Sequence, residues 1–393
     1  MKFRPAEDGD AAVIAALTRE AFQRGRARSV EDAPLDVSDR YVLVVDDVVL
    51  GTAAATPVEQ YVGGVALPTA AVWSVAVSDT ARGRGIGREL MSGLIGSLRD
   101  QGVVQSVLFP SVPAPYRAVG YEIAGERRVL RTPLHTLPTV ADPLPVRAWH
   151  DDDLDAVAAC YETLAAAHSG PLRRPRSWWT GRVLASHGGA LLYRRAVEED
   201  GAVTGYVVYT KDEAPADLPY YYDVTVHDVA WLTPAAGRSL LDYLGSHRAL
   251  GVDVRWPAAA ADLWSTQLAG AVPRVDFAYP WMSRLVDPVA ALSARRYAPG
   301  VTARVVIAVT DPVLQPAEYG LDIEVSGGAA AVRPVEGATA PRLDVGALAA
   351  LHTGWATARD LARGGRLIGA DEAEVAALDT VFAGPRPWLP DLF

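Results

Sequence analysis

The spacing of apolar residues predicts that the chain begins with alternating strands and helices. Residues 3–22, FRPAEDGDAAVIAALTREAF, join a short apolar start, an acidic loop and an apolar stripe at helical spacing. This pattern predicts a strand followed by a helix over 10–22. Residues 41–62 hold two apolar runs around Asp46 and Asp47, which predicts two strands joined by a tight turn. The chain therefore opens as a mixed α/β fold.

A second helix is predicted between two further strands. Residues 69–77, TAAVWSVAV, and residues 103–111, VVQSVLFPS, are apolar runs of strand length. Between them, apolar side chains recur at helical spacing at Ile86, Leu90, Leu94 and Leu98, and Gly102 marks the end of the predicted helix. The segment 78–88 therefore connects the end of a strand to the start of a helix.

The remaining chain predicts two more units. Residues 146–164, VRAWHDDDLDAVAACYETL, repeat the layout of the opening segment, and Asp152 and Asp153 in them are typical of a helix N-terminus. The proline-rich residues 131–149 predict a linker, and from about Asp287 short alternating strands precede helices. We therefore expect α/β and α+β classes in three domains: residues 1–135, a second copy of the first fold without its glycine loop over 136–286, and an α+β unit over 287–393.

Composition narrows the classes of function. A chain of 393 residues fits two or three domains, and a net charge of -10 argues against nucleic acid as a partner. The single cysteine, Cys160, excludes an internal disulfide and is expected to be a buried thiol. The start is charged, and no apolar run reaches the roughly 18 residues of a membrane span. We expect a soluble cytoplasmic protein with no membrane partner, and no metal, because the histidines lack metal-ligand spacing.

The connection before the second helix has a composition typical of phosphate binding. A nucleotide P-loop is excluded because Arg88 and Glu89 stand where it needs a lysine and a hydroxyl residue. A dinucleotide fingerprint is excluded because the spacing is G-x-G-x-G and the next strand carries no acidic residue. There remains R-x-x-G-x-G at a helix start, where free N–H groups, the helix dipole and arginines favour a pyrophosphate. Its residues are Arg82, Gly83, Arg84, Gly85, Ile86, Gly87 and Arg88.

This motif, directly after VWSVAV, resembles the acetyl-CoA-binding motif of the GNAT superfamily of N-acetyltransferases. The segments LFPSVPAPYRAVGYEIAG, WMSRLVDPVAALSARRYA and LDVGALAALHTGWATARDLA, and the aromatic C-terminus, extend the resemblance to the enhanced-intracellular-survival (Eis) acetyltransferases. It implies an active GNAT domain, a degenerate GNAT domain and a sterol-carrier-like domain, assembled as a homo-hexamer. It also implies acetyl transfer from acetyl-CoA to small-molecule amines, including those of aminoglycosides.

The resemblance also implies roles for single residues. The 82–88 loop should hold the pyrophosphate of acetyl-CoA, and five further residues should lie along its pantetheine arm or nearby: Val75, Ala76, Val77, Ser111 and Val112. Tyr116 corresponds to the general acid that protonates the departing thiolate. Tyr121 takes the place of a core aromatic residue. The α-carboxylate of Phe393 should help to deprotonate the amine.

The acceptor pocket is less well defined. The resemblance places Phe22, Arg24 and Trp73 at its wall, but Arg24 and the penultimate Leu392 stand where acidic residues are expected. Both departures weaken the attraction of a cation. The loop after Arg24 carries four acidic side chains, which either restore negative charge to the acceptor pocket or are simply solvated: Glu31, Asp32, Asp36 and Asp39. Two alternatives therefore stay open, an acyl-CoA or lipid-binding protein without turnover and a protein lysine acetyltransferase.

Overall fold

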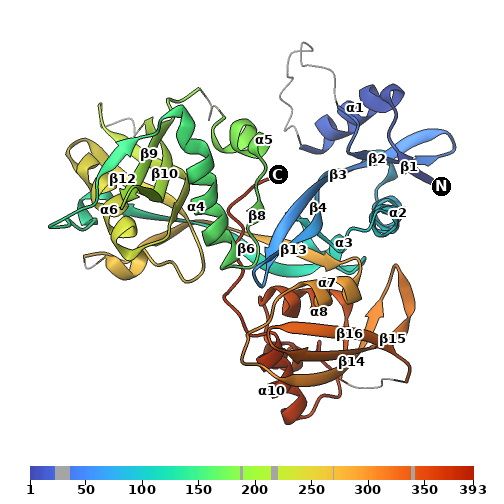
Figure 1. Cartoon of the computed structure of the whole chain (residues 1–393). Helices are drawn as coiled ribbons and strands as arrows, with labels where there is room; N and C mark the ends of the chain where they lie inside the picture. Colours follow the sequence, from blue (N-terminus) through green and yellow to red (C-terminus); the bar gives the residue numbers. More distant parts are fainter. Residues whose placement is uncertain (23–35, 186–188, 214–219, 269, 338–340) are drawn as a thin grey trace.

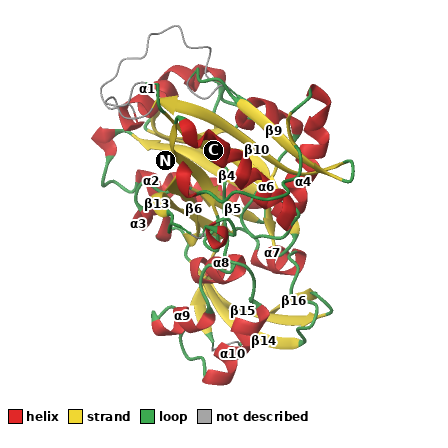
Figure 2. Cartoon of the chain, turned by 90° about the vertical axis from the view of Figure 1, so that its left-hand side faces the viewer, coloured by secondary structure: helices red, strands yellow, loops and turns green. Residues whose placement is uncertain are grey.

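The computed structural model describes residues 1–22, 36–185, 189–213, 220–268, 270–337 and 341–393. The chain forms three lobes, two of them side by side and the third beneath them (Figure 1). A view turned by 90° again shows the third lobe below the other two (Figure 2). The predicted residues Arg24, Glu31 and Asp32 lie outside the described part of the chain.

The first lobe contains the predicted strands and helices in the predicted order. Asp46 and Asp47 both have positive φ, 49° and 62°, as a tight hairpin turn requires. The elements are β1 (Lys2–Pro5), α1 (Ala11–Phe22), β2 (Arg40–Val45), β3 (Val48–Val62), β4 (Val65–Val77), α2 (Ile86–Asp100), β5 (Gln105–Leu108), α3 (Pro113–Arg117) and β6 (Glu122–Pro133).

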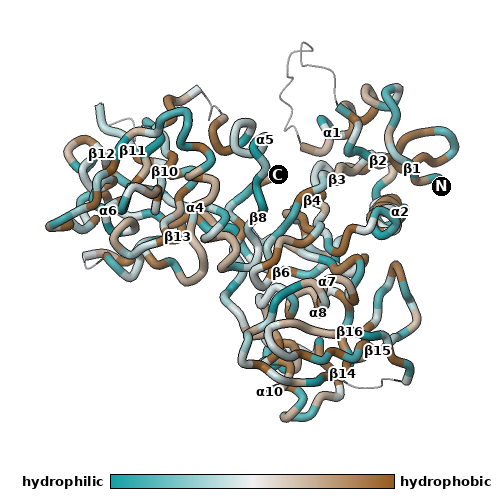
Figure 3. The backbone as a smooth tube through the Cα atoms, in the orientation of Figure 1, coloured by the Kyte–Doolittle hydropathy of each residue, from teal (hydrophilic) through white to brown (hydrophobic). Residues whose placement is uncertain are grey.

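Helices α1 and α2 cover opposite faces of this part of the sheet. Leu43 of β2 packs with Leu90 and Leu94 of α2, whereas the residue directly before it, Val42, packs with Ile14 of α1. Successive residues of a strand point to opposite faces, so one strand serves both cores. Figure 3 shows the corresponding apolar stretches, in brown, along β4.

The second lobe repeats the strand and helix layout of the first. Asp153 is the N-cap of its first long helix and binds Arg147 through two hydrogen bonds of 2.6 and 2.8 Å. Cys160 is buried in that helix, as expected. The elements are β7 (Val146–Ala148), α4 (Leu154–Ala166), β8 (Leu172–Arg173), α5 (Arg176–Trp178), β9 (Tyr193–Glu199), β10 (Ala202–Glu213), β11 (Tyr222–Trp231), α6 (Pro234–Gly245), β12 (Gly251–Ala258) and β13 (Arg274–Leu285).

One continuous sheet joins the two upper lobes. In the described residues its strand order is β1-β2-β3-β4-β5-β13-β6-β12-β11-β10-β9-β7, with β8 paired to β3. Strand β13, the last element of the second lobe in sequence, thus lies between β5 and β6 of the first lobe. The prediction of a linker over 131–149 was wrong at its start, because Thr132 is still in β6 and pairs with Val254 of β12.

The third lobe is an α+β unit with its own sheet. It contains α7 (Pro288–Ala294), β14 (Ala303–Asp311), β15 (Gln315–Ser326), β16 (Ala329–Val335), β17 (Arg342–Asp344), α8 (Val345–Thr353), α9 (Ala358–Arg363) and α10 (Glu372–Val381). Its strand order is β16-β15-β14-β17. The buried Arg284 of β13 ties this lobe to the first, since it donates to Asp311 at 2.7 Å and to the Val119 carbonyl at 2.9 Å.

Candidate active site

Strands β4 and β5 separate in the middle of the first lobe. They pair in parallel from Thr69–Gln105 to Val72–Leu108, but β4 continues to Val77 beside β3. Ser74 has a φ of 53°, and the register of β4 against β3 shifts beside it. A non-glycine residue in this conformation costs about 1–3 kcal/mol, and such strain concentrates at functional sites. Beyond Val72, the edge of β4 that faces β5 is therefore open to a ligand.

The glycine loop leads from the end of β4 into α2. Gly83 and Gly85 have φ values of 75° and 80°, and Gly85 is the N-cap of α2 with no side-chain cap bond. A Cβ atom at either glycine would meet nothing within 4 Å, so these positions need glycine for the backbone conformation and not for space. The first-turn N–H groups of α2 have no intrahelical partner and form an anion site.

A pocket of 440 Å³ lies between this loop, β4 and α3. It brings together most of the residues that the sequence predicted for the cofactor. Predicted residues in its lining are Val75, Val77, Arg82, Gly83, Gly85, Ile86, Gly87, Arg88, Ser111, Val112 and Tyr116. The other two, Ala76 and Arg84, are not in the lining; Ala76 is buried against β3, where it pairs with Thr52.

Tyr116 lies on the short helix α3 at the wall of this pocket. Burial, and to a lesser degree the nearby Tyr279, raise the pKa of Tyr116, so its phenol stays protonated at neutral pH. Tyr121 contacts it edge-on at 6.2 Å between ring centroids. The Tyr121 hydroxyl is buried and bonded to Ser106 at 2.7 Å, which agrees with the predicted core role. Of the two, Tyr116 is the phenol that can give a proton to a ligand.

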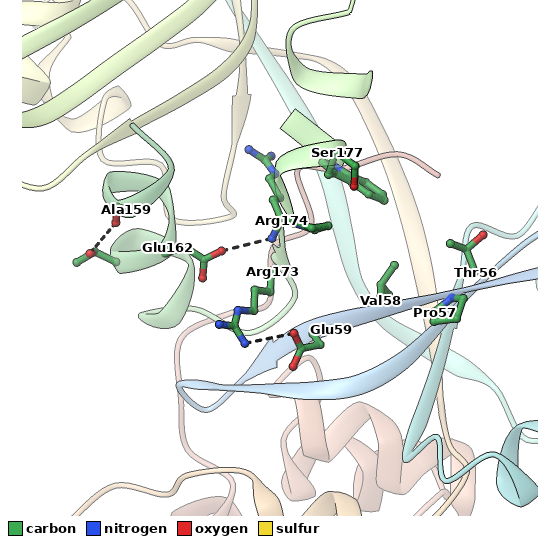
Figure 4. A pocket seen from close by; sticks show the side chains of 12 residues that line it. Thr56, Pro57, Val58, Glu59, Ala159, Glu162, Arg173, Arg174 and Ser177 are labelled. Carbon is green, nitrogen blue, oxygen red and sulfur yellow. Dashed lines mark hydrogen bonds and ion pairs between the residues drawn. The ribbon is translucent and has the colours of Figure 1, made fainter. Parts of the chain in front are cut away.

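A larger cavity of 1050 Å³ lies between β3 and the second lobe (Figure 4). The Trp73 indole N–H donates to Thr56 Oγ1 at 3.1 Å, and Thr56 lines this cavity. Trp73 itself is in the lining of neither cavity, and it lies two residues before Val75 of the cofactor pocket. Phe22 ends α1 with half of its surface exposed and is not in the lining.

One of the two carboxylates that line the larger cavity has a cationic partner. Figure 4 shows Glu59 beside Arg173 and Glu162 directed at the backbone of Arg174. The Glu59–Arg173 ion pair measures 3.3 Å, and the Arg174 N–H donates to Glu162 at 3.3 Å. The rest of the lining is largely apolar and includes Trp178. Glu162 has no cationic partner among the described residues, and the Arg174 side chain is paired with Asp228 and Asp391, so the cavity keeps a negative charge.

The C-terminal tail leaves the third lobe and ends beside β8 and α5 of the second lobe (Figure 1). The Phe393 ring lies 5.3 Å from Phe109, which follows β5. Backbone contacts fix the approach: Trp388 N–H donates to the Ser169 carbonyl at 2.8 Å, and Arg127 donates to the Pro390 carbonyl at 3.0 Å. The structure thus brings Phe393, the last residue of the third domain, into contact with the first lobe.

Asp391 is a site residue that sequence reasoning missed. It is buried and accepts hydrogen bonds from Arg174 at 2.9 Å and from the Trp178 indole at 3.0 Å. Arg174 also donates to Asp228 at 2.8 Å. A single aspartate in a proline-rich tail gave no motif, because its partners come from another lobe. This cluster holds the last residues of the chain in place.

In the described residues of the second lobe, the space at the start of α6 is filled by side chains. Trp264 is buried there, stacks on Trp231 at 4.8 Å, and donates to the Gly237 carbonyl at 3.1 Å. The first turn of α6 is also capped, since the Thr233 hydroxyl accepts from the Ala236 N–H at 3.1 Å. Indole rings and a cap thus occupy the space that is open at α2.

We therefore predict that calorimetry will measure one acetyl-CoA bound per chain. The N–H cluster that attracts a pyrophosphate is open at Gly85 and closed at Thr233. Replacing Trp264 with alanine should lower stability without creating a second site, because the R-x-x-G-x-G loop is missing there. Two equivalent sites per wild-type chain would contradict the assignment.

In the part of the chain that the structure describes, no group of three or more His, Cys, Asp or Glu side chains lies close enough to hold a metal ion. Within the same residues, no helix is both long and apolar enough to cross a membrane.

Comparisons with known proteins find a domain family for each of three segments of the chain. The family description "Acetyltransferase (GNAT) domain" matches residues 2–124 and, for a second family of that description, residues 170–285. "Sterol carrier protein domain" matches residues 288–390. An uncharacterized N-acetyltransferase of Streptomyces avermitilis is 28% identical over 95% of each chain, and one of Streptomyces griseus is 27% identical over 84% of this chain and 83% of its own.

Solved structures share the whole fold. A GCN5-related N-acetyltransferase from Anabaena variabilis superposes over 100% of both chains with a TM-score of 0.90 at 24% identity. Eis1 from Mycobacterium abscessus also covers 100% of both chains, with a TM-score of 0.81 at 23% identity. At these identities the likeness shows the fold alone. The chain therefore carries two GNAT acetyltransferase domains and a sterol carrier protein domain, and it shares the three-lobed fold of Eis1.

Proposed function

We propose that this protein transfers the acetyl group of acetyl-CoA to the amine of a small molecule, and that the transfer takes place where β4 and β5 separate. One observation carries the proposal. The open helix start at Gly85, the free edge of β4 and the protonated Tyr116 line a single pocket. Acetyl transfer needs these three: a phosphate site, a track for the pantetheine arm and a proton donor at the sulfur.

The residues of the pocket fit acetyl-CoA, whose thioester supplies the activated acetyl group. Arg82, Arg88 and the first-turn N–H groups of α2 would hold the pyrophosphate. The backbone of β4 from Val75 to Val77 would bind the pantetheine amides. Tyr116 would then lie near the sulfur, with its proton available.

The reaction then balances with three proton transfers. The amine nitrogen forms a bond to the acetyl carbon, and the carbon–sulfur bond breaks. The Tyr116 hydroxyl gives its proton to the thiolate and recovers the proton that the nitrogen loses as the amide forms, directly or through water. The α-carboxylate of Phe393 would take the proton of the ammonium, directly or through water. The 1050 Å³ cavity beside Trp73 would admit the amine from the α1 face of the sheet.

Amine-dependent release of thiol from acetyl-CoA by the purified protein tests the proposal. Detection of the N-acetylated small molecule by mass spectrometry would establish the acceptor. Binding of acetyl-CoA without thiol release would favour the non-catalytic alternative. Acetylation of protein lysines but of no small amine would instead favour a protein lysine acetyltransferase. Aminoglycosides as acceptors, and a homo-hexameric assembly, remain predictions.

The tail provides a further prediction. Adding one glycine after Phe393, or deleting Phe393, displaces the terminal carboxylate by about 3.5 Å. Amine acetylation should fall at least about tenfold, the expected loss when a positioned base is displaced. Acetyl-CoA affinity should be unchanged, because the glycine loop is untouched. Asp391→Asn should act in the same direction, since it weakens the bond to Arg174 that holds the tail. Wild-type rates in both end variants would exclude the carboxylate from the mechanism.

A further inference from the structure

Arg40 is a buried arginine beside the strained segment of β4. Its side chain is 5% exposed, and its guanidinium lies 4.7 Å over the ring of Trp73. Nε donates to the Asp36 carbonyl at 3.2 Å, and Nη1 donates to Ser74 Oγ at 3.3 Å. Its other terminal nitrogen, Nη2, makes no hydrogen bond to any described residue. One edge of the guanidinium is therefore available.

The charge of Arg40 has no carboxylate partner within 4.0 Å among the residues that the structure describes. Of the other buried arginines, Arg174 binds Asp228 and Asp391, and Arg284 binds both oxygens of Asp311. Arg295 has no carboxylate partner in the described residues either, and it donates to the His352 carbonyl. A buried charge without a partner is costly. The pKa of Arg40 is accordingly lowered by its burial. An anion that binds beside Arg40 would remove much of this cost.

The position of Arg40 connects it to the acceptor and not to the cofactor. Arg40 and Val42 are alternate residues of β2, so both point to the α1 face, whereas the glycine loop and α2 lie on the other. Ser74, its hydrogen-bond partner, adjoins Val75 of the cofactor pocket. Trp73, beneath it, reaches Thr56 at the wall of the large cavity. Arg40 thus contacts Trp73 and Ser74, the two residues of β4 that precede Val75 of the cofactor pocket.

We propose that Arg40 binds an anionic group of the acceptor, so that the preferred acceptor is an amine with a carboxylate close to the reacting nitrogen, as in an α-amino acid. The inference rests on the proposed function and names its substrate class. A guanidinium with a free edge matches a carboxylate by shape and charge. A polycation would instead bring positive charge towards Arg40, which has no carboxylate within 4.0 Å among the described residues.

The test compares acceptors that differ in one group. Thiol release is measured with several α-amino acids of apolar side chain and with the neutral amide of each. Rates are expressed per unprotonated amine, because each amide has a lower amine pKa than its acid. The wild-type kcat/KM should favour the carboxylate by about ten- to a hundredfold, the range of one charge-assisted hydrogen bond. In Arg40→Met that ratio should fall to near one, and Arg40→Lys should keep part of it.

The ratio is measured within one sample, so partial unfolding of a variant does not change it. Arg304→Met is the matched control, since Arg304 is an exposed arginine of the third lobe paired with Asp322. It should leave the ratio at the wild-type value. Thiol release with equal preference for acid and amide, or an unchanged ratio in Arg40→Met, would overturn the inference while the acetyltransferase function stands. No thiol release with any amine would overturn the proposed function, and the inference with it.

Discussion

Replacing Tyr116 with phenylalanine is expected to lower kcat for amine acetylation by a factor of about 10²–10⁴ while acetyl-CoA affinity is unchanged. The ring remains, so the pocket wall that it forms is kept. What is lost is the proton for the thiolate. Steady-state thiol release gives the rate, and calorimetry gives the affinity. A wild-type rate in Tyr116→Phe would show that another group or water protonates the thiolate.

Tyr121→Phe is the matched control for this variant. It removes a phenol five residues away, whose hydroxyl bonds Ser106 and not the pocket. Its unfolding free energy should fall by about 1 kcal/mol, with little change in rate. The pH profile provides a second check. Because burial raises the pKa of Tyr116, the proton donor is retained as pH rises through about 10, where a free tyrosine ionises. The wild-type rate should fall only above that pH.

Gly85→Glu is expected to abolish acetyl-CoA binding. Gly85 has a φ of 80° and open space where a Cβ would be, so a glutamate side chain would extend into the pocket. Its carboxylate would take the place of the pyrophosphate at the N-terminus of α2 and repel it. Calorimetry should detect no binding, and thiol release should fall to background with every amine.

Gly102→Glu separates this effect from backbone strain. Gly102 follows the other end of α2, has a φ of 75°, and also has nothing within 4 Å of an added Cβ. The two variants therefore share the same charge change and nearly the same conformational penalty. Gly102→Glu should bind acetyl-CoA as the wild type does. Loss of binding in both variants would mean that strain in α2, and not blockage of the anion site, is responsible.

Local patterns were sufficient to predict much of the fold. The apolar spacing of Ile86, Leu90, Leu94 and Leu98 marked α2, because one face of that helix is buried. The turn at Asp46 was equally local. The place of β13 between β5 and β6 was not predictable, since the pairing of Met282 with Leu108 joins residues far apart in sequence. The linker prediction failed at Thr132 for the same reason, because its partner in β12 is distant.

The residues of the candidate site likewise fall into those that local sequence predicts and those that depend on distant partners. The glycine loop could be predicted because its chemistry lies in consecutive residues with positive φ and a helix start. Arg40, Arg174 and Asp391 could not, since each depends on partners from other elements. The roles of Tyr116 and Phe393 came from resemblance, and the structure adds that one lines the pocket and the other lies on Phe109.

The central claim is that the pocket beside Gly85 and Tyr116 acetylates an amine. Its most direct test is a single-turnover experiment with acetyl-CoA, a panel of small amines and enzyme in excess. Thiol and N-acetyl product are quantified in the same sample for wild type and Tyr116→Phe. We expect equal amounts of thiol and N-acetyl amine from the wild type, and a rate about 10²–10⁴ lower in the variant. Tight binding of acetyl-CoA with no amine-dependent product from the wild type would contradict the claim.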